Sequence, residues 1–165
     1  MSEQDIRRSI VNCSRGEAAS MTLPRELETL DWESLTFLAW RDPKAPLRGY
    51  LVTWKDGGVV GIQLRAAESK MSRRVSTMCF LCRTSQPGSN VSLFVARRAG
   101  QAGRNGNTVG TYICADLVCS RNVLMEKPSA SLHPDPGRSV AQRVDGLRAR
   151  TDSFIDEVLG SSLSA

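Results

Sequence analysis

The spacing of apolar positions predicts one amphipathic helix near each end of the chain. Ser2 and Asp5 have the spacing of a capping box at a helix start. The apolar stripe that follows consists of Ile6, Ile10 and Cys13, and residues 14–17 are expected to end this first helix. Near the other end, residues 137–159 form the strongest helical pattern. Its apolar positions recur every three or four residues: Val140, Val144, Leu147, Thr151, Phe154 and Val158.

Between the two helices the pattern becomes that of β-strands. Apolar, β-branched and aromatic residues dominate segments 35–40, 50–54 and 59–64. The last two segments are joined by Lys-Asp-Gly-Gly at 55–58, which favours a tight hairpin. Residues 41–46 contain two prolines and are expected to form the longer connection of a three-stranded meander.

A second β-hairpin is predicted further along the chain. Residues 91–96 and 108–113 have strand patterns, and a glycine-rich turn or loop over residues 99–107 separates them. The segment at 68–74 is polar and precedes a change in composition. We therefore expect two parts, residues 1–70 and residues 71–165.

Composition and charge narrow the class of protein. With 41% apolar and 24% charged residues in 165, the chain can bury a core. No apolar run approaches the roughly 18–20 residues that span a bilayer, and the polar start does not resemble a signal peptide. We expect a cytoplasmic protein without membrane contact. The net charge of +5 comes entirely from residues 71–165, because basic and acidic residues balance in 1–70.

Four of the five cysteines have the spacing of a metal site. Cys79 and Cys82 form a C-x2-C pair, and Cys114 and Cys119 form a C-x4-C pair. An odd number of cysteines in a reducing compartment argues against a disulfide framework. Four thiolates favour a tetrahedral structural zinc ion with no open position for water; an iron–sulfur cluster and a thioredoxin-type redox pair are the alternatives. The fifth cysteine, Cys13, is interpreted as a small core residue.

The order of elements around these cysteines predicts the fold. A zinc knuckle, a β-hairpin and a short helix beginning near Cys114 follow one another as in a treble-clef finger. The expected class is therefore α+β: an N-terminal helix and β-meander, then a treble-clef zinc finger with a long C-terminal helix. We assign no ligand or catalytic role to the single histidine, His133.

The basic residues of the second half have two explanations. Arg83 and Arg121 lie near the cysteines, where four thiolates and one Zn²⁺ carry a net charge of −2 that they can offset. The remaining basic residues are in excess of that need. They suit either RNA phosphate or an acidic protein surface, and charge alone does not separate the two.

The motif around the third ligand adds a family resemblance. The C-x2-C pair, the glycine-rich hairpin, the Gly-Thr-Tyr-Ile-Cys-Ala-Asp-x2-Cys stretch at 110–119 and the long final helix resemble the elongation factor G-binding proteins of the FusB-type fusidic acid resistance family. This resemblance covers roughly residues 71–165 and implies a treble-clef zinc finger. It matches Cys79, Cys82, Cys114 and Cys119 to the metal ligands.

The same resemblance implies a function without catalysis. Relatives bind the C-terminal domains of elongation factor G through the zinc module and promote its release from the ribosome. Tyr112 lies where the family places an aromatic contact. To it we add basic residues suited to an acidic surface on the factor: Arg83, Arg97, Arg98 and Arg104.

Two function classes follow from these observations. The first is a zinc-dependent protein-binding factor that acts on elongation factor G. The second is a zinc-finger RNA-binding or ribosome-associated protein, for which the basic segment and Tyr112 as a stacking surface would suffice. We expect no enzyme and no small-molecule substrate, because no acid–base pair or open metal position is evident.

Overall fold

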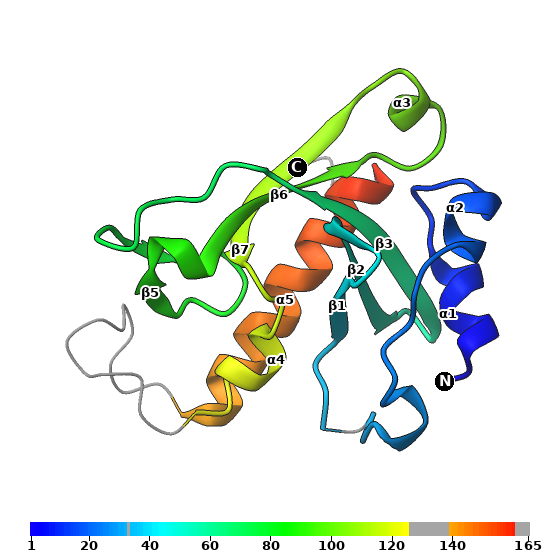
Figure 1. The fold of residues 1–165 in the computed structure, drawn as a ribbon. Helices are drawn as coiled ribbons and strands as arrows, with labels where there is room; N and C mark the ends of the chain where they lie inside the picture. The colour runs from blue at the N-terminus through cyan, green and yellow to red at the C-terminus, as the bar shows by residue number, and fades with distance from the viewer. Residues whose placement is uncertain (33, 126–138, 161–165) are drawn as a thin grey trace.

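A five-stranded antiparallel sheet lies at the centre of the structure (Figure 1), a computed structural model that describes residues 1–32, 34–125 and 139–160. Its strands are, in spatial order, β1 (Leu38–Asp42), β2 (Ala45–Lys55), β3 (Gly58–Ala66), β6 (Val91–Arg97) and β7 (Thr108–Cys114). Helices and an antiparallel sheet together confirm the predicted α+β class.

The three-stranded meander is present, with its first connection shorter than expected. Asp56 and Gly57 both have positive φ, 50° and 78°, as a two-residue hairpin turn requires. Residues 41–46 are not a long connection: Asp42 pairs with Ala45 across a two-residue turn. The reason is the buried Asp42 carboxylate, which accepts hydrogen bonds from the amides of Lys44 and Thr22.

The N-terminal helix begins as predicted and ends early. α1 (Glu3–Ser9) has its capping box at Ser2, but Ile10 is extended and Cys13 lies beyond the helix. Residues 14–17 do not end it; they begin a second helix, α2 (Arg15–Ala19). A second capping box, formed by Ser14 with Glu17, starts that helix and was missed in the sequence pattern.

The C-terminal helix covers the opposite face of the sheet from α1. α5 (Val140–Leu159) runs from Ser139 as N-cap to Gly160 in the left-handed conformation; the predicted start at 137 lies outside the described residues. Its buried side chains belong to one cluster with Leu51 and Phe94, whereas Tyr50 and Val52 pack with α1 on the other side. Successive residues of β2 therefore face different layers.

The remaining elements are short. β4 (Ser76–Met78) pairs with β5 (Ser85–Pro87), and the others are α3 (Gly100–Arg104), α4 (Cys119–Asn122) and two 3₁₀ turns at Leu27–Thr29 and Gly88–Asn90. The glycine-rich segment thus contains the helical turn α3, and the short helix predicted near residue 114 begins at 119. The boundary predicted near residue 70 falls between β3 and β4, while the sheet includes strands from both sides of it. No helix in the described ranges has the length and apolar character needed to cross a bilayer.

Strands β3 and β6 separate after two paired residues, and Asn12 bridges the gap. The ladder includes Arg65 with Val95, so its continuation would place Gln63 opposite Arg97. Instead, Asn12 Nδ2 donates to the carbonyl oxygens of Gln63 and Arg97, both at 2.9 Å, and Asn12 Oδ1 accepts from the Gln63 amide at 2.7 Å. A buried asparagine therefore replaces the missing strand contacts.

Replacing Asn12 with leucine should destabilise the whole fold. The variant Asn12→Leu leaves the buried Gln63 amide and two carbonyl groups without partners, at a cost on the order of 1–3 kcal/mol. Urea unfolding followed by circular dichroism measures the change. As the matched control, Asn107→Leu alters an exposed asparagine and should leave the unfolding free energy unchanged within about 0.5 kcal/mol. Equal stability of the two variants would contradict the bridging role.

Candidate metal centre

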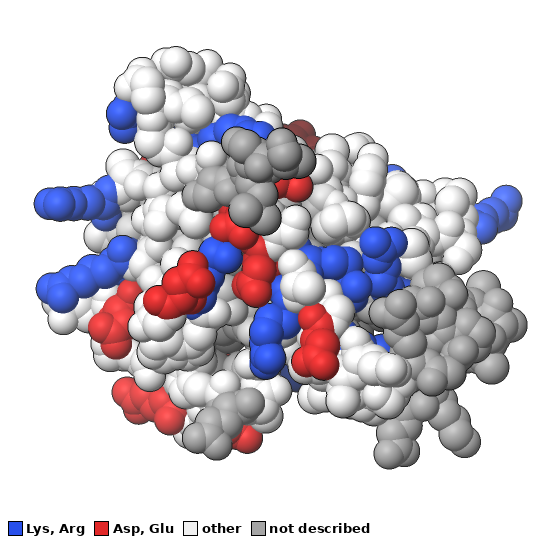
Figure 2. Space-filling view, turned by 180° about the vertical axis from the view of Figure 1, so that it is seen from behind, with Lys and Arg blue, Asp and Glu red and all other residues white. Residues whose placement is uncertain are grey.

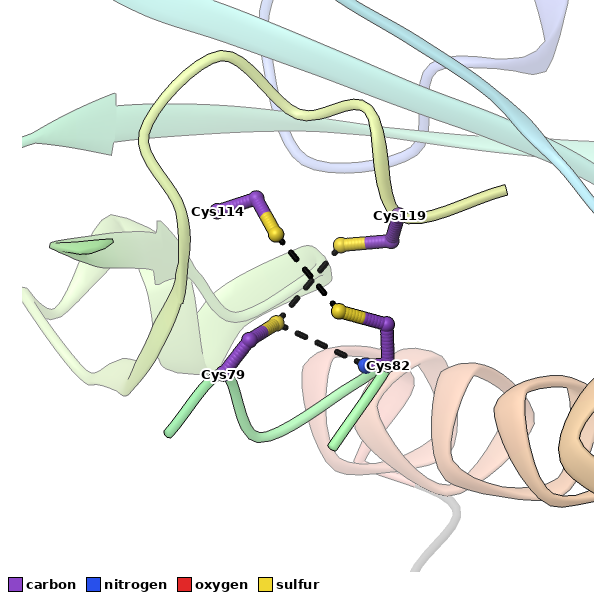
Figure 3. A group of neighbouring side chains, drawn as sticks. All are labelled: Cys79, Cys82, Cys114 and Cys119. Carbon is purple, nitrogen blue, oxygen red and sulfur yellow. Dashed lines mark hydrogen bonds between the residues drawn. The ribbon is translucent and has the colours of Figure 1, made fainter. Parts of the chain in front are cut away.

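The four predicted ligands meet in one cluster (Figure 3). Cys79 and Cys82 lie on the turn between β4 and β5, Cys114 ends β7, and Cys119 begins α4. All four sulfur atoms lie within 4.8 Å of one another. The structure therefore brings together residues that are separated by as many as 40 positions in the chain.

The sulfur separations fit a single ion. The Sγ atoms of Cys79 and Cys119 are 3.6 Å apart, and those of Cys82 and Cys114 are 3.5 Å apart. Zn–S bonds of about 2.3 Å in a tetrahedron require S···S separations of about 3.8 Å. A disulfide would need about 2.05 Å, and the ligands of an iron–sulfur cluster stand further apart because several atoms lie between them. The separations therefore fit one tetrahedrally coordinated zinc ion and are too long for a disulfide.

The first cysteine pair is held by the backbone of its turn. The Cys82 amide donates to Cys79 Sγ, and the Arg83 amide donates to the Cys79 carbonyl oxygen at 3.0 Å. The Cys79 amide in turn donates to the Thr84 carbonyl oxygen at 3.1 Å. Arg83 has φ of 58°, a left-handed conformation that closes the turn. Both sulfurs consequently point to the same side (Figure 3).

The second pair is set by a loop that folds into the core. Leu117 also has positive φ, 63°, and its amide donates to the Cys114 carbonyl oxygen at 3.0 Å. Its side chain is buried in the same cluster as the sheet and α5. This fold-back explains the spacer of four residues, because it returns the chain so that Cys119, at the start of α4, faces Cys114.

Three polar side chains donate to the sulfurs. Thr84 Oγ1 lies 3.1 Å from Cys82 Sγ, while Gln86 Nε2 and Asn122 Nδ2 lie 3.2 and 3.3 Å from Cys114 Sγ. Such donors stabilise thiolate charge and orient the ligands. The sequence pattern did not indicate them, because polar residues near a cysteine occur in many loops.

Burial and the close approach of the four sulfurs shift the pKa values of the cysteine thiols. All four side chains are buried. The pKa of the Cys119 thiol is raised by its neighbours Cys114, Cys79 and Cys82, and burial raises it further; hydrogen bonds from Cys114 and Cys119 lower the pKa of Cys82. Four thiolates repel one another unless a cation lies between them. With four protein ligands the shell is closed, which makes the site structural.

The metal loop is also fastened to the sheet. Arg41, on β1, donates through Nε to the Ala115 carbonyl oxygen and through Nη1 to the Pro46 carbonyl oxygen, and its guanidinium lies 5.0 Å from the centre of the Phe94 ring. Partial burial lowers the pKa of Arg41. Ser120 Oγ donates to the carbonyl oxygen of Phe37, a residue that precedes β1, at 2.8 Å. The site and the N-terminal meander are thus joined by direct contacts.

Two predicted contact residues lie together beside the metal. Tyr112 is exposed, and the amide of Phe80 donates to the Tyr112 carbonyl oxygen at 2.8 Å. The guanidinium of Arg83 lies 5.4 Å from the centre of the Phe80 ring. We call Phe80, Arg83 and Tyr112 the knuckle patch. Phe80 was missed in the sequence, although its position between two ligands was a signal that it would be exposed on a tight turn.

The other predicted contact residues lie at the far end of the hairpin. Arg97 pairs with Thr108, whereas Cys114 at the metal end pairs with Val91. Seven-residue strands span about 20 Å. Arg97 forms an ion pair with Glu17 at 2.9 Å; Arg98 donates to the Glu157 carbonyl oxygen and Arg104 to Gln101 Oε1. The structure therefore separates these three arginines from the knuckle patch, and their role as contacts stays a prediction.

Cys13 is separate from the metal site. It is half-buried against the cluster around α1, and burial, with a smaller contribution from Glu17, raises the pKa of its thiol to about 11. At neutral pH it is therefore a protonated packing residue. His133 lies outside the described residues.

Comparison with known proteins identifies the family. A family model described as FBP C-terminal treble-clef zinc-finger matches residues 5–158, so the chain belongs to this family. The comparisons with curated proteins and with solved structures returned no match. Family and geometry together confirm the predicted treble-clef finger and its structural zinc ion.

Removing one ligand should remove the metal. Cys114→Ser deletes a thiolate that also accepts hydrogen bonds from Gln86 and Asn122, so we expect the zinc content to fall from one ion per chain to near zero. The melting temperature should fall as well, because structural zinc binding contributes on the order of 10 kcal/mol to such folds.

Elemental analysis and thermal unfolding measure both effects. Cys13→Ser is the matched control, since it removes a thiol outside the cluster and should keep one zinc ion per chain. Zinc retained at full stoichiometry by Cys114→Ser would refute the ligand assignment.

Proposed function

We propose that this chain is a protein-binding factor that acts on elongation factor G and promotes its release from the ribosome. Membership of the treble-clef family supports the proposal, and so does the resemblance of the 110–119 stretch to the elongation factor G-binding proteins. The closed four-cysteine shell has no position for a substrate, so the proposed role is recognition without catalysis, carried out in the cytoplasm.

The observation that carries this proposal is the knuckle patch. Phe80 and Tyr112 are large exposed side chains, with 38% and 47% of their surface accessible. Phe80 directly follows the ligand Cys79, and Tyr112 lies two residues before Cys114, so the backbone of both is fixed before any partner arrives. Aromatic residues and arginine are the side chains most enriched in binding hot spots, and a rigid backbone lowers the entropic cost of association.

The distant arginines suit a supporting role. Arg97 is partly neutralised by Glu17, and Arg98 and Arg104 donate to oxygen atoms of the chain itself. Charges at the rim of an interface mainly change the association rate and its salt dependence. We propose that this group steers an acidic factor towards the knuckle patch without carrying most of the affinity.

RNA binding is the second candidate function. An exposed tyrosine and phenylalanine beside Arg83 could stack on unpaired bases. Binding to RNA backbone, however, favours a continuous basic surface. The face shown in Figure 2 carries basic and acidic side chains together, which supports a protein partner over RNA for that face.

Truncating the knuckle patch should weaken binding to elongation factor G. Phe80→Ala and Tyr112→Ala each remove an exposed aromatic ring, and we expect each to raise the dissociation constant about 30-fold, as for a hot spot of about 2 kcal/mol. Isothermal titration calorimetry with purified factor measures the loss. Trp54→Ala, which removes an exposed aromatic ring at the β2–β3 hairpin, should bind normally.

Ribonuclease treatment separates the two candidate functions. In a pull-down from cell lysate with this chain as bait, we expect elongation factor G to stay bound after nuclease treatment. Binding that is lost with nuclease and falls steeply with salt would instead favour RNA.

The double variant Arg97→Glu with Arg98→Glu should slow association with elongation factor G and leave the zinc content unchanged.

A further inference from the structure

A cavity of about 580 Å³ lies away from the metal centre, and of its lining residues the proposed function uses only Arg97, in a steering role. It opens where β3 and β6 separate, next to the Asn12 bridge, and is bounded by the start of β2 and by Glu17 of α2. Pro46, Leu47 and Val95 contribute apolar wall. The volume lies within the range of about 300–1,000 Å³ that is typical of small-molecule sites.

Three arginines line this cavity. Arg48 on β2 is paired directly with Arg65 on β3, and Arg97 lies on β6 two residues beyond Val95, the partner of Arg65. Like charges directly opposite one another on a sheet are unfavourable. A site that gathers three arginines on one sheet face therefore favours an anion between them.

The protein itself neutralises these arginines only in part. Arg97 has Glu17 at 2.9 Å, while Arg65 reaches Glu68 only at 3.9 Å, with 77% of each side chain exposed. Such an exposed and distant pair contributes little. The Arg48 side chain forms no hydrogen bond or ion pair with the described residues. Among the lining residues, three cations face one carboxylate.

Gln63 also lines the cavity, but its side-chain nitrogen lies beneath the cavity surface. The residue is 9% exposed, and its Nε2 is fully buried without a hydrogen-bond partner among the described residues. Asn12 binds the backbone amide and carbonyl groups of Gln63. The indication of a ligand therefore comes from the arginines and not from this amide.

We propose that this cavity binds the terminal phosphate of a small organic phosphate monoester. Guanidinium forks match phosphate oxygens, and a monoester carries a charge of about −1.5 to −2, which suits three arginines and one glutamate. A phosphodiester carries only one negative charge, so it balances three arginines and one glutamate less well. The apolar wall accommodates the organic part.

The test uses the full zinc-loaded chain and three probes: phenyl phosphate, inorganic phosphate and dimethyl phosphate. Calorimetry and amide chemical shifts should show one site at which phenyl phosphate binds best, inorganic phosphate follows, and dimethyl phosphate is at least about tenfold weaker than phenyl phosphate. Equal binding of dimethyl phosphate would overturn the assignment to a terminal phosphate.

Variants separate the cavity from general charge effects. Arg48→Gln should weaken phenyl phosphate binding by at least about tenfold, whereas Arg73→Gln, an exposed arginine outside the cavity lining, should change it less than about twofold. Arg48→Gln should keep its zinc and lose the phosphate-induced rise in melting temperature. No binding of any probe, or equal binding by all variants, would overturn the proposal. Because these positions lie outside the knuckle patch, that failure would leave binding of elongation factor G untouched.

Discussion

One constraint organises this molecule: four thiolates can share a small buried volume only with a cation between them. The cysteines come from a turn, a strand end and a helix start, and the elements around them are short. β4 and β5 have three residues each, too few to be stable without further support. Zinc ligation stabilises these short strands. Hydrogen bonds from Thr84, Gln86 and Asn122 help to balance the negative charge of the thiolates.

The metal is also built into the rest of the fold. All four ligands belong to the same buried cluster as Leu51 of β2, Phe94 of β6 and Phe154 of α5. Arg41 and Ser120 link the metal loop to β1 and to the residues before it. The zinc ion therefore fixes the exposed knuckle patch relative to the whole sheet, which gives the proposed recognition surface a rigid backbone.

Features of the fold that depend on neighbouring residues could be predicted from the sequence. Features that depend on contacts between distant segments could not. The cysteine spacing, the capping box at Ser2 and the Asp-Gly turn each act within a few residues, so the sequence showed them. The tight turn at Asp42 depends on the amide of Thr22, twenty residues away, and the Asn12 bridge depends on two separated strands. Neither leaves a periodic pattern. The second capping box at Ser14 was visible, but apolar spacing across Cys13 had suggested one continuous helix. Counting charges along the sequence likewise placed Arg83 and Arg97 in one group, although they lie at opposite ends of the hairpin.

The most direct test of the central claim is X-ray absorption at the zinc edge of the purified full chain. Four sulfur scatterers at about 2.3 Å, with one zinc ion per chain, are the result that this account predicts. Absence of zinc, or a first shell that contains nitrogen or oxygen in place of one of the four cysteine sulfurs, would contradict it.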